Sequence, residues 1–213
     1  LSIRRQRQMC IRDRLDIEHK LEDVPLEFTV EGSDASQRIT VPLSGSIDFA
    51  GIDEHGAPVL LDFKWTNSTS RYAGYVAENA SLQLATYAWA YGTQRAEVRE
   101  PRTGYFMLRQ GEFVTNDRGL GGRGASSEGG SLALFERLRA TIEDELSAIA
   151  AGHVTSALGD LALASGLSNY ETAHKKAAAE LAEARAQAGR VFVDHNAGYS
   201  DYRLLTGLTG DYS

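Results

Sequence analysis

Residues 39–65 constrain the fold more than any other part of the chain, because apolar and polar residues alternate on both sides of a polar turn. The stretch before the turn includes SIDFAGI (46–52), and the stretch after it is VLLDFKW (59–65). A period of two is typical of half-buried β-strands, and the Asp-Glu-His-Gly sequence between the stretches is typical of a turn. We therefore predict a β-hairpin with strands at residues 39–52 and 59–65.

The alternation also predicts where three charged side chains point. On the second strand, Asp62 and Lys64 are two residues apart, so both project from the same face. On the first strand, Asp48 points away from the face that carries Ile47 and Phe49, and the hairpin can bring it next to Asp62. The hairpin thus predicts two carboxylates and one amine on a common face.

Two neighbouring carboxylates repel each other, and burial makes both of them harder to ionise. Mg²⁺ relieves that repulsion, since it binds one or two carboxylates and keeps several waters. The backbone carbonyl of Phe63 is a candidate for a further oxygen ligand. Alternatively, Asp48, Asp62 and Lys64 form the solvated face of an ordinary hairpin, where an ion pair contributes less than about 1 kcal/mol. The spacing alone leaves both interpretations open.

The remaining sequence predicts further strands and helices around the hairpin. The expected elements lie at residues 26–31 (strand), 77–91 (helix), 104–108 and 113–114 (strands), and 132–151 and 170–188 (helices). Strands come first, a helix and another strand follow, and helices end the chain. This order predicts an α+β or mixed α/β core with a central sheet.

Composition divides the 213 residues into four expected parts. They are an Arg-rich segment at 1–14, a core at 15–115, a flexible glycine-rich loop at 116–131, and a helical C-terminal part at 132–213 that packs on the core. The sequence RRQRQMCIRD in the first part resembles a translated sequencing adapter. We therefore expect residues 1–14 to be non-native or disordered, and a native N-terminus to be missing.

Composition also excludes several kinds of site. A single cysteine, Cys10, excludes an internal disulfide framework and a site built from several thiolates. No apolar run approaches the roughly 18–20 residues that a membrane helix needs, so we expect a cytoplasmic protein without a membrane partner. The net charge of −7 means that charge alone would not hold a phosphate backbone.

Three short motifs in a fixed order carry a resemblance to a known family. They are G-x-I-D on the first strand of the hairpin, D-F-K-W on the second, and Q-x-x-x-Y on the following helix. The matching residues are Gly45, Ile47, Asp48, Asp62, Phe63, Lys64, Trp65, Gln83 and Tyr87. The set resembles the PD-(D/E)XK nuclease superfamily, in particular its RecB-like branch. Glu27, in the segment PLEFTVE, resembles the acidic position on the first strand of many members.

The resemblance implies a restriction-endonuclease-like α/β fold, with a central mixed sheet flanked by helices and a C-terminal helical extension. It also implies that Asp48 and Asp62 bind Mg²⁺ or Mn²⁺ and that Lys64 is the catalytic lysine. Gln83 and Tyr87 lie one helical turn apart and are expected beside the site, in contact with DNA or supporting Lys64. RecB-like members usually have an upstream metal-binding residue, and His19 is the candidate for that ligand.

The function that the resemblance implies is metal-dependent hydrolysis of DNA phosphodiester bonds, as an exonuclease rather than a site-specific endonuclease. Recombination, repair or defence is the expected setting, with a helicase or another subunit as partner. The alternative is a catalytically inactive module of the same fold that binds DNA or a partner. Several relatives hold an iron–sulfur cluster with C-terminal cysteines; the tail here has none, so no cluster is expected. Trp65 and Trp89 are expected in the core rather than as platforms on which bases stack.

Overall fold

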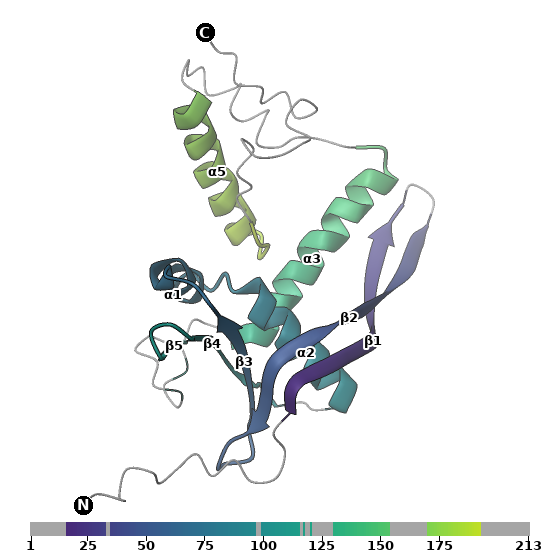
Figure 1. Cartoon of the computed structure of the whole chain (residues 1–213). Coiled ribbons are helices and arrows are strands. Elements are labelled where there is room, and N and C mark those ends of the chain that lie inside the picture. The colour runs from purple at the N-terminus through teal and green to yellow at the C-terminus, as the bar shows by residue number, and fades with distance from the viewer. Residues whose placement is uncertain are drawn as a thin grey trace, which may run out of the picture. The chain divides into compact units, whose positions relative to one another are not determined.

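The computed structural model contains one five-stranded sheet with helices (Figure 1). The residues that the structure describes are 16–32, 35–96, 99–115, 117, 120, 130–153 and 170–192. The strands are β1 (Asp16–Glu31), β2 (Ser36–Ile52), β3 (Pro58–Lys64), β4 (Arg102–Met107) and β5 (Glu112–Val114). They lie in the sheet in the same order as in the chain.

The sheet is mixed, as predicted. β2 and β3 are antiparallel, with Phe49 opposite Leu61, whereas β3 and β4 are parallel, with Asp62 opposite Tyr105. β4 and β5 are again antiparallel. A parallel pair of strands requires a long crossover connection, and here that connection contains the helices α1 (Thr69–Ala77) and α2 (Leu82–Arg95). The α/β class with a central mixed sheet is therefore confirmed.

The chain separates into two compact units, and each is described by itself. The first comprises residues 1–28 and 38–139, and the second comprises residues 29–37 and 140–213. Helix α3 (Gly130–Ala150) begins in the first unit and continues into the second, which also contains α5 (Tyr170–Gln187). Within the second unit, the backbone amides of Thr29 and Glu31 donate hydrogen bonds to side chains of α3.

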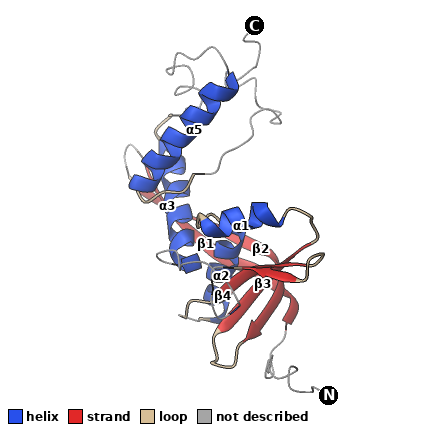
Figure 2. Ribbon diagram, turned by 90° about the vertical axis from the view of Figure 1, so that its left-hand side faces the viewer, coloured by secondary structure: helices blue, strands red, loops and turns tan. Residues whose placement is uncertain are grey.

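The core of the first unit forms where α1 and α2 cover one face of the sheet (Figure 2). One cluster joins Ile47 and Leu60 of the sheet to Ala90 of α2. A second cluster joins α1 and α2 to β4 and β5, and its members are Val76, Leu84, Tyr105, Met107 and Val114. The same two helices are thereby held over the strands that carry the predicted site residues.

A row of phenylalanine rings crosses the other face of the sheet. Phe49 of β2 and Phe63 of β3 have ring centroids 6.5 Å apart, and the ring of Phe106 on β4 lies 6.0 Å from that of Phe63. The row continues to Phe113 of β5, with centroids 4.9 Å apart. Aromatic pairs at such distances add to sheet stability beyond their buried area. We call these four side chains the phenylalanine row.

Two elements differ from the sequence-based prediction. Residues 77–91 were expected to form one helix, but the chain instead forms α1 and α2 with a break at residues 78–81, where Asn79 has a φ of 50°. The first strand begins at Asp16 rather than at Leu26, so it contains Pro25. Proline is tolerated there because β1 is an edge strand, where one side needs no ladder hydrogen bonds.

Within the described residues, no helix combines the length and the apolar character needed to cross a membrane.

Candidate active site

Strand β3 holds two charged side chains against the covered face of the sheet. Asp62 lies opposite Tyr105 and Lys64 lies opposite Met107 in the parallel ladder with β4. Since side chains alternate along a strand, Asp62 and Lys64 share a face, as the sequence predicted. Asp62 is only 2% exposed, whereas the side chain of Lys64 is 21% exposed. A buried carboxylate needs a partner, and Lys64 supplies one.

Four side chains are joined by direct contacts. Nζ of Lys64 lies 2.6 Å from Oδ2 of Asp62 and donates a hydrogen bond of 3.0 Å to Oε1 of Gln83. Nε2 of Gln83 donates to Oδ1 of Asp62 at 2.7 Å and to the hydroxyl oxygen of Tyr87 at 2.9 Å. Gln83 and Tyr87 reach the same point because they are one turn apart on α2. We call Asp62, Lys64, Gln83 and Tyr87 the site network.

Asp48 approaches the network from β2. Its Oδ2 accepts a hydrogen bond of 2.7 Å from the backbone amide of Phe63, the residue between Asp62 and Lys64. The regular pairing of β2 with β3 includes Phe49 and Leu61, so Asp48 bonds to β3 just beyond that pairing. The two carboxylates therefore flank the same stretch of β3, and their charges interact.

Burial dominates the electrostatics of the site. Loss of hydration raises the pKa of Asp62 above its ordinary value; the hydrogen bond and the charge of Lys64 oppose this rise, and the negative charge of Asp48 adds to it. Burial likewise raises the pKa of the Tyr87 hydroxyl. The fold thus places negative charge where water does not stabilise it well, which favours the binding of a cation.

Aromatic rings surround the ammonium group of Lys64. Its Nζ lies 5.6 Å from the ring centroid of Tyr72 on α1 and 5.7 Å from that of Tyr105 on β4, within the range of cation–π attraction. The two rings pack edge to face, with centroids 4.8 Å apart. Burial raises the pKa of Tyr105 to about 12, so this ring is neutral at physiological pH. Sequence reasoning missed both tyrosines, and no motif signals them.

The donor set fits a hard divalent cation. Asp48 and Asp62 offer carboxylate oxygens, which Mg²⁺ prefers, and Mg²⁺ commonly retains water at its other positions. The charge repulsion between the two acids is what such an ion would relieve. In the described part of the chain, no group of three or more acidic, histidine or cysteine side chains gathers to form a metal cage. The carbonyl of Phe63 as a ligand stays a prediction.

Comparison with protein families agrees with this geometry. The model of one family, the PD-(D/E)XK nuclease superfamily, matches residues 3–160. The chain belongs to this superfamily. A search of curated proteins found no match. The match covers every element of the site, from β1 to the end of α3, and it supports the restriction-endonuclease-like fold predicted from the sequence. The RecB-like branch remains a prediction.

Two predicted positions of the PD-(D/E)XK site lie outside the network. His19 is on β1, where Nδ1 contacts a carboxylate oxygen of Asp16 at 3.1 Å and Nε2 lies 2.9 Å from Oε1 of Gln94. Both ring nitrogens are therefore engaged, and neither contact involves Asp48 or Asp62. Glu27 is exposed and lies 3.7 Å from Arg38. The structure brings neither residue to the site network, and His19 as a metal ligand stays a prediction.

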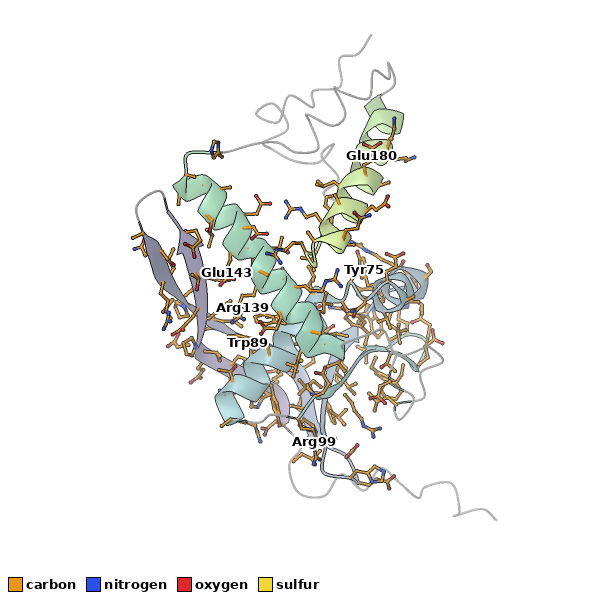
Figure 3. The ribbon with its side chains drawn as sticks, turned by 180° about the vertical axis from the view of Figure 1, so that it is seen from behind. Tyr75, Trp89, Arg99, Arg139, Glu143 and Glu180 are labelled. Atoms are coloured by element: carbon orange, nitrogen blue, oxygen red, sulfur yellow. The ribbon has the colours of Figure 1, made fainter. Side chains whose placement is uncertain are left out.

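The two tryptophans differ in their surroundings. Trp89 of α2, labelled in Figure 3, stacks on Phe135 of α3, with ring centroids 4.5 Å apart and planes at 12°, so the expectation of core packing is confirmed. Trp65 directly follows the catalytic candidate Lys64 and is 74% exposed, so the expectation was wrong for this residue. A strand pattern predicts that Trp65 shares a face with Phe63, but β3 ends at Lys64.

Proposed function

We propose that the protein is a metal-dependent deoxyribonuclease, with Asp48 and Asp62 as ligands of Mg²⁺ or Mn²⁺ and Lys64 as the catalytic lysine. The proposal rests above all on one observation, the direct contact of Lys64 with a carboxylate that the fold buries beside a second carboxylate. Membership in a superfamily of nucleases supports it. A hydrolytic site for phosphodiesters requires cationic charge near the scissile phosphate, and this cluster can supply it.

Each side chain of the site has a distinct task in the proposed reaction. A bound divalent ion supplies Lewis acidity and neutralises charge on the phosphate. The ammonium of Lys64 orients the attacking water and stabilises negative charge on the pentavalent phosphorus. Gln83 positions Lys64 and Asp62 because it bonds to both of them. Tyr87 holds the amide of Gln83 from the next turn of α2.

Asp62 would serve two partners in the proposed site, Lys64 and a metal ion. Both oxygens of the carboxylate are engaged, one by Lys64 and one by Gln83. A cation held by this carboxylate would weaken the attraction of Asp62 for Lys64, whereas the carbonyl of Gln83 and the rings of Tyr72 and Tyr105 would still hold the ammonium. These contacts would keep the ammonium in the site, within reach of a phosphate oxygen.

We also propose that the enzyme acts as an exonuclease in recombination, repair or defence, in the cytoplasm and together with a helicase or another subunit. The net charge of −7 supports a strand delivered by a partner, because an acidic chain attracts free DNA poorly. The proposal of a partner is tested by measuring the affinity of the isolated protein for DNA at low and at physiological salt. At physiological salt we expect weak binding, because the chain is acidic.

A nuclease assay tests the proposed activity. Single- and double-stranded DNA labelled at either end is incubated with Mg²⁺, Mn²⁺ or a chelator, and product sizes over time separate end-directed from internal cleavage. We expect cleavage with metal only, and a loss of at least about 100-fold in Lys64→Ala and Asp62→Asn. The matched control is Lys176→Ala, an exposed lysine of α5 paired with Glu180. Equal rates in Lys64→Ala and the unsubstituted protein contradict the proposal.

One observation favours the inactive-module alternative. In the described residues, only two carboxylates gather at the site, with no third acidic or histidine ligand. An inactive module would bind DNA or a partner without metal-dependent cleavage, and Asp62→Asn would leave that binding unchanged. Isothermal titration with Mn²⁺ separates the two cases, since a nuclease requires metal binding that Asp62→Asn abolishes.

A further inference from the structure

The surface next to the candidate active site contains an exposed tryptophan. Trp65 is 74% exposed and directly follows Lys64. Tryptophan has one of the largest apolar surfaces of all side chains, and it is usually at least partly buried unless it binds something. The only other tryptophan, Trp89, is stacked on Phe135 as this rule leads one to expect. The exposure of Trp65 therefore needs a functional explanation.

An arginine accompanies this tryptophan. Cζ of Arg109 lies 5.8 Å from the centroid of the Trp65 ring, within cation–π range. Among the described residues, Arg109 forms no salt bridge, so its charge remains available to an anion. The indole and the guanidinium together offer a flat π surface and a positive charge. This pair suits a ligand that has both a ring and an anionic group.

The sheet fixes the position of this pair. β3 and β4 are parallel, so their C-terminal ends meet at the same edge, and Trp65 and Arg109 follow those ends. The backbone amide of Leu108 donates to the carbonyl of Lys64 at 3.1 Å, and Nε2 of Gln110 donates to the carbonyl of Thr66 at 3.2 Å. The two loops are thus bonded to each other directly beside Lys64. Leu108, whose backbone makes the first of these bonds, is a second apolar residue exposed in this loop, at 42%.

We propose that Trp65, Leu108 and Arg109, here called the Trp65 platform, bind an unpaired nucleobase of the substrate strand. This inference rests on the proposed nuclease function and specifies its substrate. A base inside a duplex has both faces stacked and cannot cover an exposed indole. The substrate is accordingly a DNA strand that is single-stranded, or frayed, at the nucleotide next to the scissile phosphate.

Nucleic acid fits the platform better than a protein does. A polynucleotide whose phosphate lies at Lys64 must place its neighbouring nucleotides within a few ångströms of that residue, and Trp65 is the adjacent residue in the chain. Arg109 matches the charge of a phosphate group. In addition, the chain is acidic overall, with a net charge of −7, so phosphate contacts alone give little affinity. Base stacking supplies binding that does not depend on net charge.

Fluorescence of a single tryptophan gives a direct test of binding. In Trp89→Phe, Trp65 is the only tryptophan, and a phenylalanine preserves the aromatic contact with Phe135. The protein is titrated with a single-stranded oligonucleotide, a blunt duplex of the same sequence and an abasic single strand, each with a chelator present so that no cleavage occurs. We expect quenching by the single strand, with at least about 5-fold weaker binding of the duplex and of the abasic strand.

Cleavage kinetics give the second part of the test. Base stacking on an aromatic ring corresponds to about 5- to 150-fold in binding, so Trp65→Ala should raise KM for single-stranded DNA by a factor in that range. Trp65→Phe should restore part of the loss, because it keeps a stacking surface. Ile149→Ala is the matched control, since Ile149 is also apolar and 57% exposed but lies near the end of α3.

The outcomes separate this inference from the proposed function. Cleavage that Trp65→Ala leaves unchanged, together with no quenching by any of the strands, overturns the inference while the nuclease proposal stands. Quenching that is equal for duplex, abasic and single strands also overturns it. Quenching by the single strand without any metal-dependent cleavage rejects the nuclease activity and retains the platform as a nucleic-acid-binding surface. No quenching by nucleic acid is also the result expected of a protein-docking surface.

Discussion

The ammonium of Lys64 lies 2.6 Å from a carboxylate oxygen of Asp62, whose side chain is almost fully buried. The contact joins two residues with different tasks in the proposed mechanism. Asp62 binds a cation, and Lys64 interacts with the phosphate. The raised pKa of Asp62 shows that Lys64 does not fully compensate for the loss of hydration and the charge of Asp48. The charged form of Asp62 therefore lowers the free energy of unfolding, and this effect can be measured.

Asp62→Asn should abolish metal-dependent cleavage without lowering stability. A carboxyl whose pKa is raised by folding contributes stability that is present below its ordinary pKa and is lost as pH rises through the folded value. At pH 7 the charged Asp62 therefore destabilises the fold, and a neutral amide of the same shape relieves this. We expect a melting temperature equal to or above that of the unsubstituted protein at pH 7. A lower melting temperature at pH 7 would contradict the prediction and would mean that the loss of one acceptor oxygen, since Lys64 and Gln83 each engage one, outweighs the relief of the buried charge.

Lys64→Met should have the opposite effect on stability, because it leaves the carboxylate of Asp62 buried without its cation. Removing one partner of a buried pair costs about 3 kcal/mol or more. The double variant with Asp62→Asn and Lys64→Met should recover most of that loss, since it removes both charges together. Chemical denaturation of the two single variants and the double variant gives the coupling energy. A double variant as unstable as Lys64→Met alone would mean that the loss does not come from the unpaired carboxylate of Asp62.

Tyr72→Leu should lower kcat and leave KM nearly unchanged. The ring of Tyr72 attracts the ammonium of Lys64 but, in the proposed mechanism, touches no substrate. Loss of one cation–π contact corresponds to about a 2- to 30-fold decrease. Tyr72→Phe keeps the ring and should retain kcat, which separates the ring from the hydroxyl. Steady-state kinetics with a saturating DNA strand measure both constants, and an effect confined to KM would place Tyr72 in substrate binding instead.

Glu100→Ala should destabilise the start of α3. Oε1 of Glu100 accepts hydrogen bonds from the backbone amides of Ser131 and Leu132, at 2.7 and 3.1 Å. Amides in the first turn of a helix have no partner within the helix, and losing such a cap costs about 1 kcal/mol, or about 2–4 °C in melting temperature. Glu100→Gln keeps an acceptor oxygen and should melt close to the unsubstituted protein. Equal melting of the Ala and Gln variants would exclude a capping role.

Arg190→Gln should destabilise the second unit at neutral pH but not in acid. Arg190 donates hydrogen bonds to the carboxylate of Asp144 on α3. These bonds and the positive charge of Arg190 hold the pKa of Asp144 below its ordinary value of 3.8. A lowered pKa gives stability that is present above the ordinary value and is lost as pH falls through the folded value. The melting curves of the two proteins, followed by circular dichroism from pH 7 to pH 2, should therefore converge at low pH.

The control for this pair is Lys176→Gln, which removes a helical ion pair with Glu180 on the surface of α5. Such pairs contribute only about 0.3–0.5 kcal/mol, so this variant should melt close to the unsubstituted protein at every pH. A difference between Arg190→Gln and the unsubstituted protein that persists at pH 2 would indicate lost packing rather than a lost charge interaction.

Much of the hairpin and its charged residues could be predicted from local sequence. Strict alternation placed Asp62 and Lys64 on one face, and the structure joins them. A spacing of four on a helix placed Gln83 next to Tyr87, and this holds although the helix begins later than expected. These predictions succeed because they depend only on the periods of strands and helices, which are fixed by backbone geometry.

Other features depend on contacts between distant segments, which no local pattern reveals. Helix α1 was missed because its polar sequence, with Ser70, Arg71 and Gly74, resembles a loop, yet Tyr72 and Val76 pack on the sheet. Trp65 was expected in the core because its chemistry is apolar. Its exposure follows from the end of β3 at Lys64, beyond which strand alternation no longer applies.

The phenylalanine row affects the opposite face of the sheet, although its four side chains do not lie on that face. A slip of β3 by one residue against its neighbours would turn Asp62 and Lys64 outward and bring the ring of Phe63 inward. The ring pairs between β2, β3, β4 and β5 oppose that slip, because it would take Phe63 away from the rings of Phe49 and Phe106. Four hydrophobic side chains thereby help to determine which way the charged residues face.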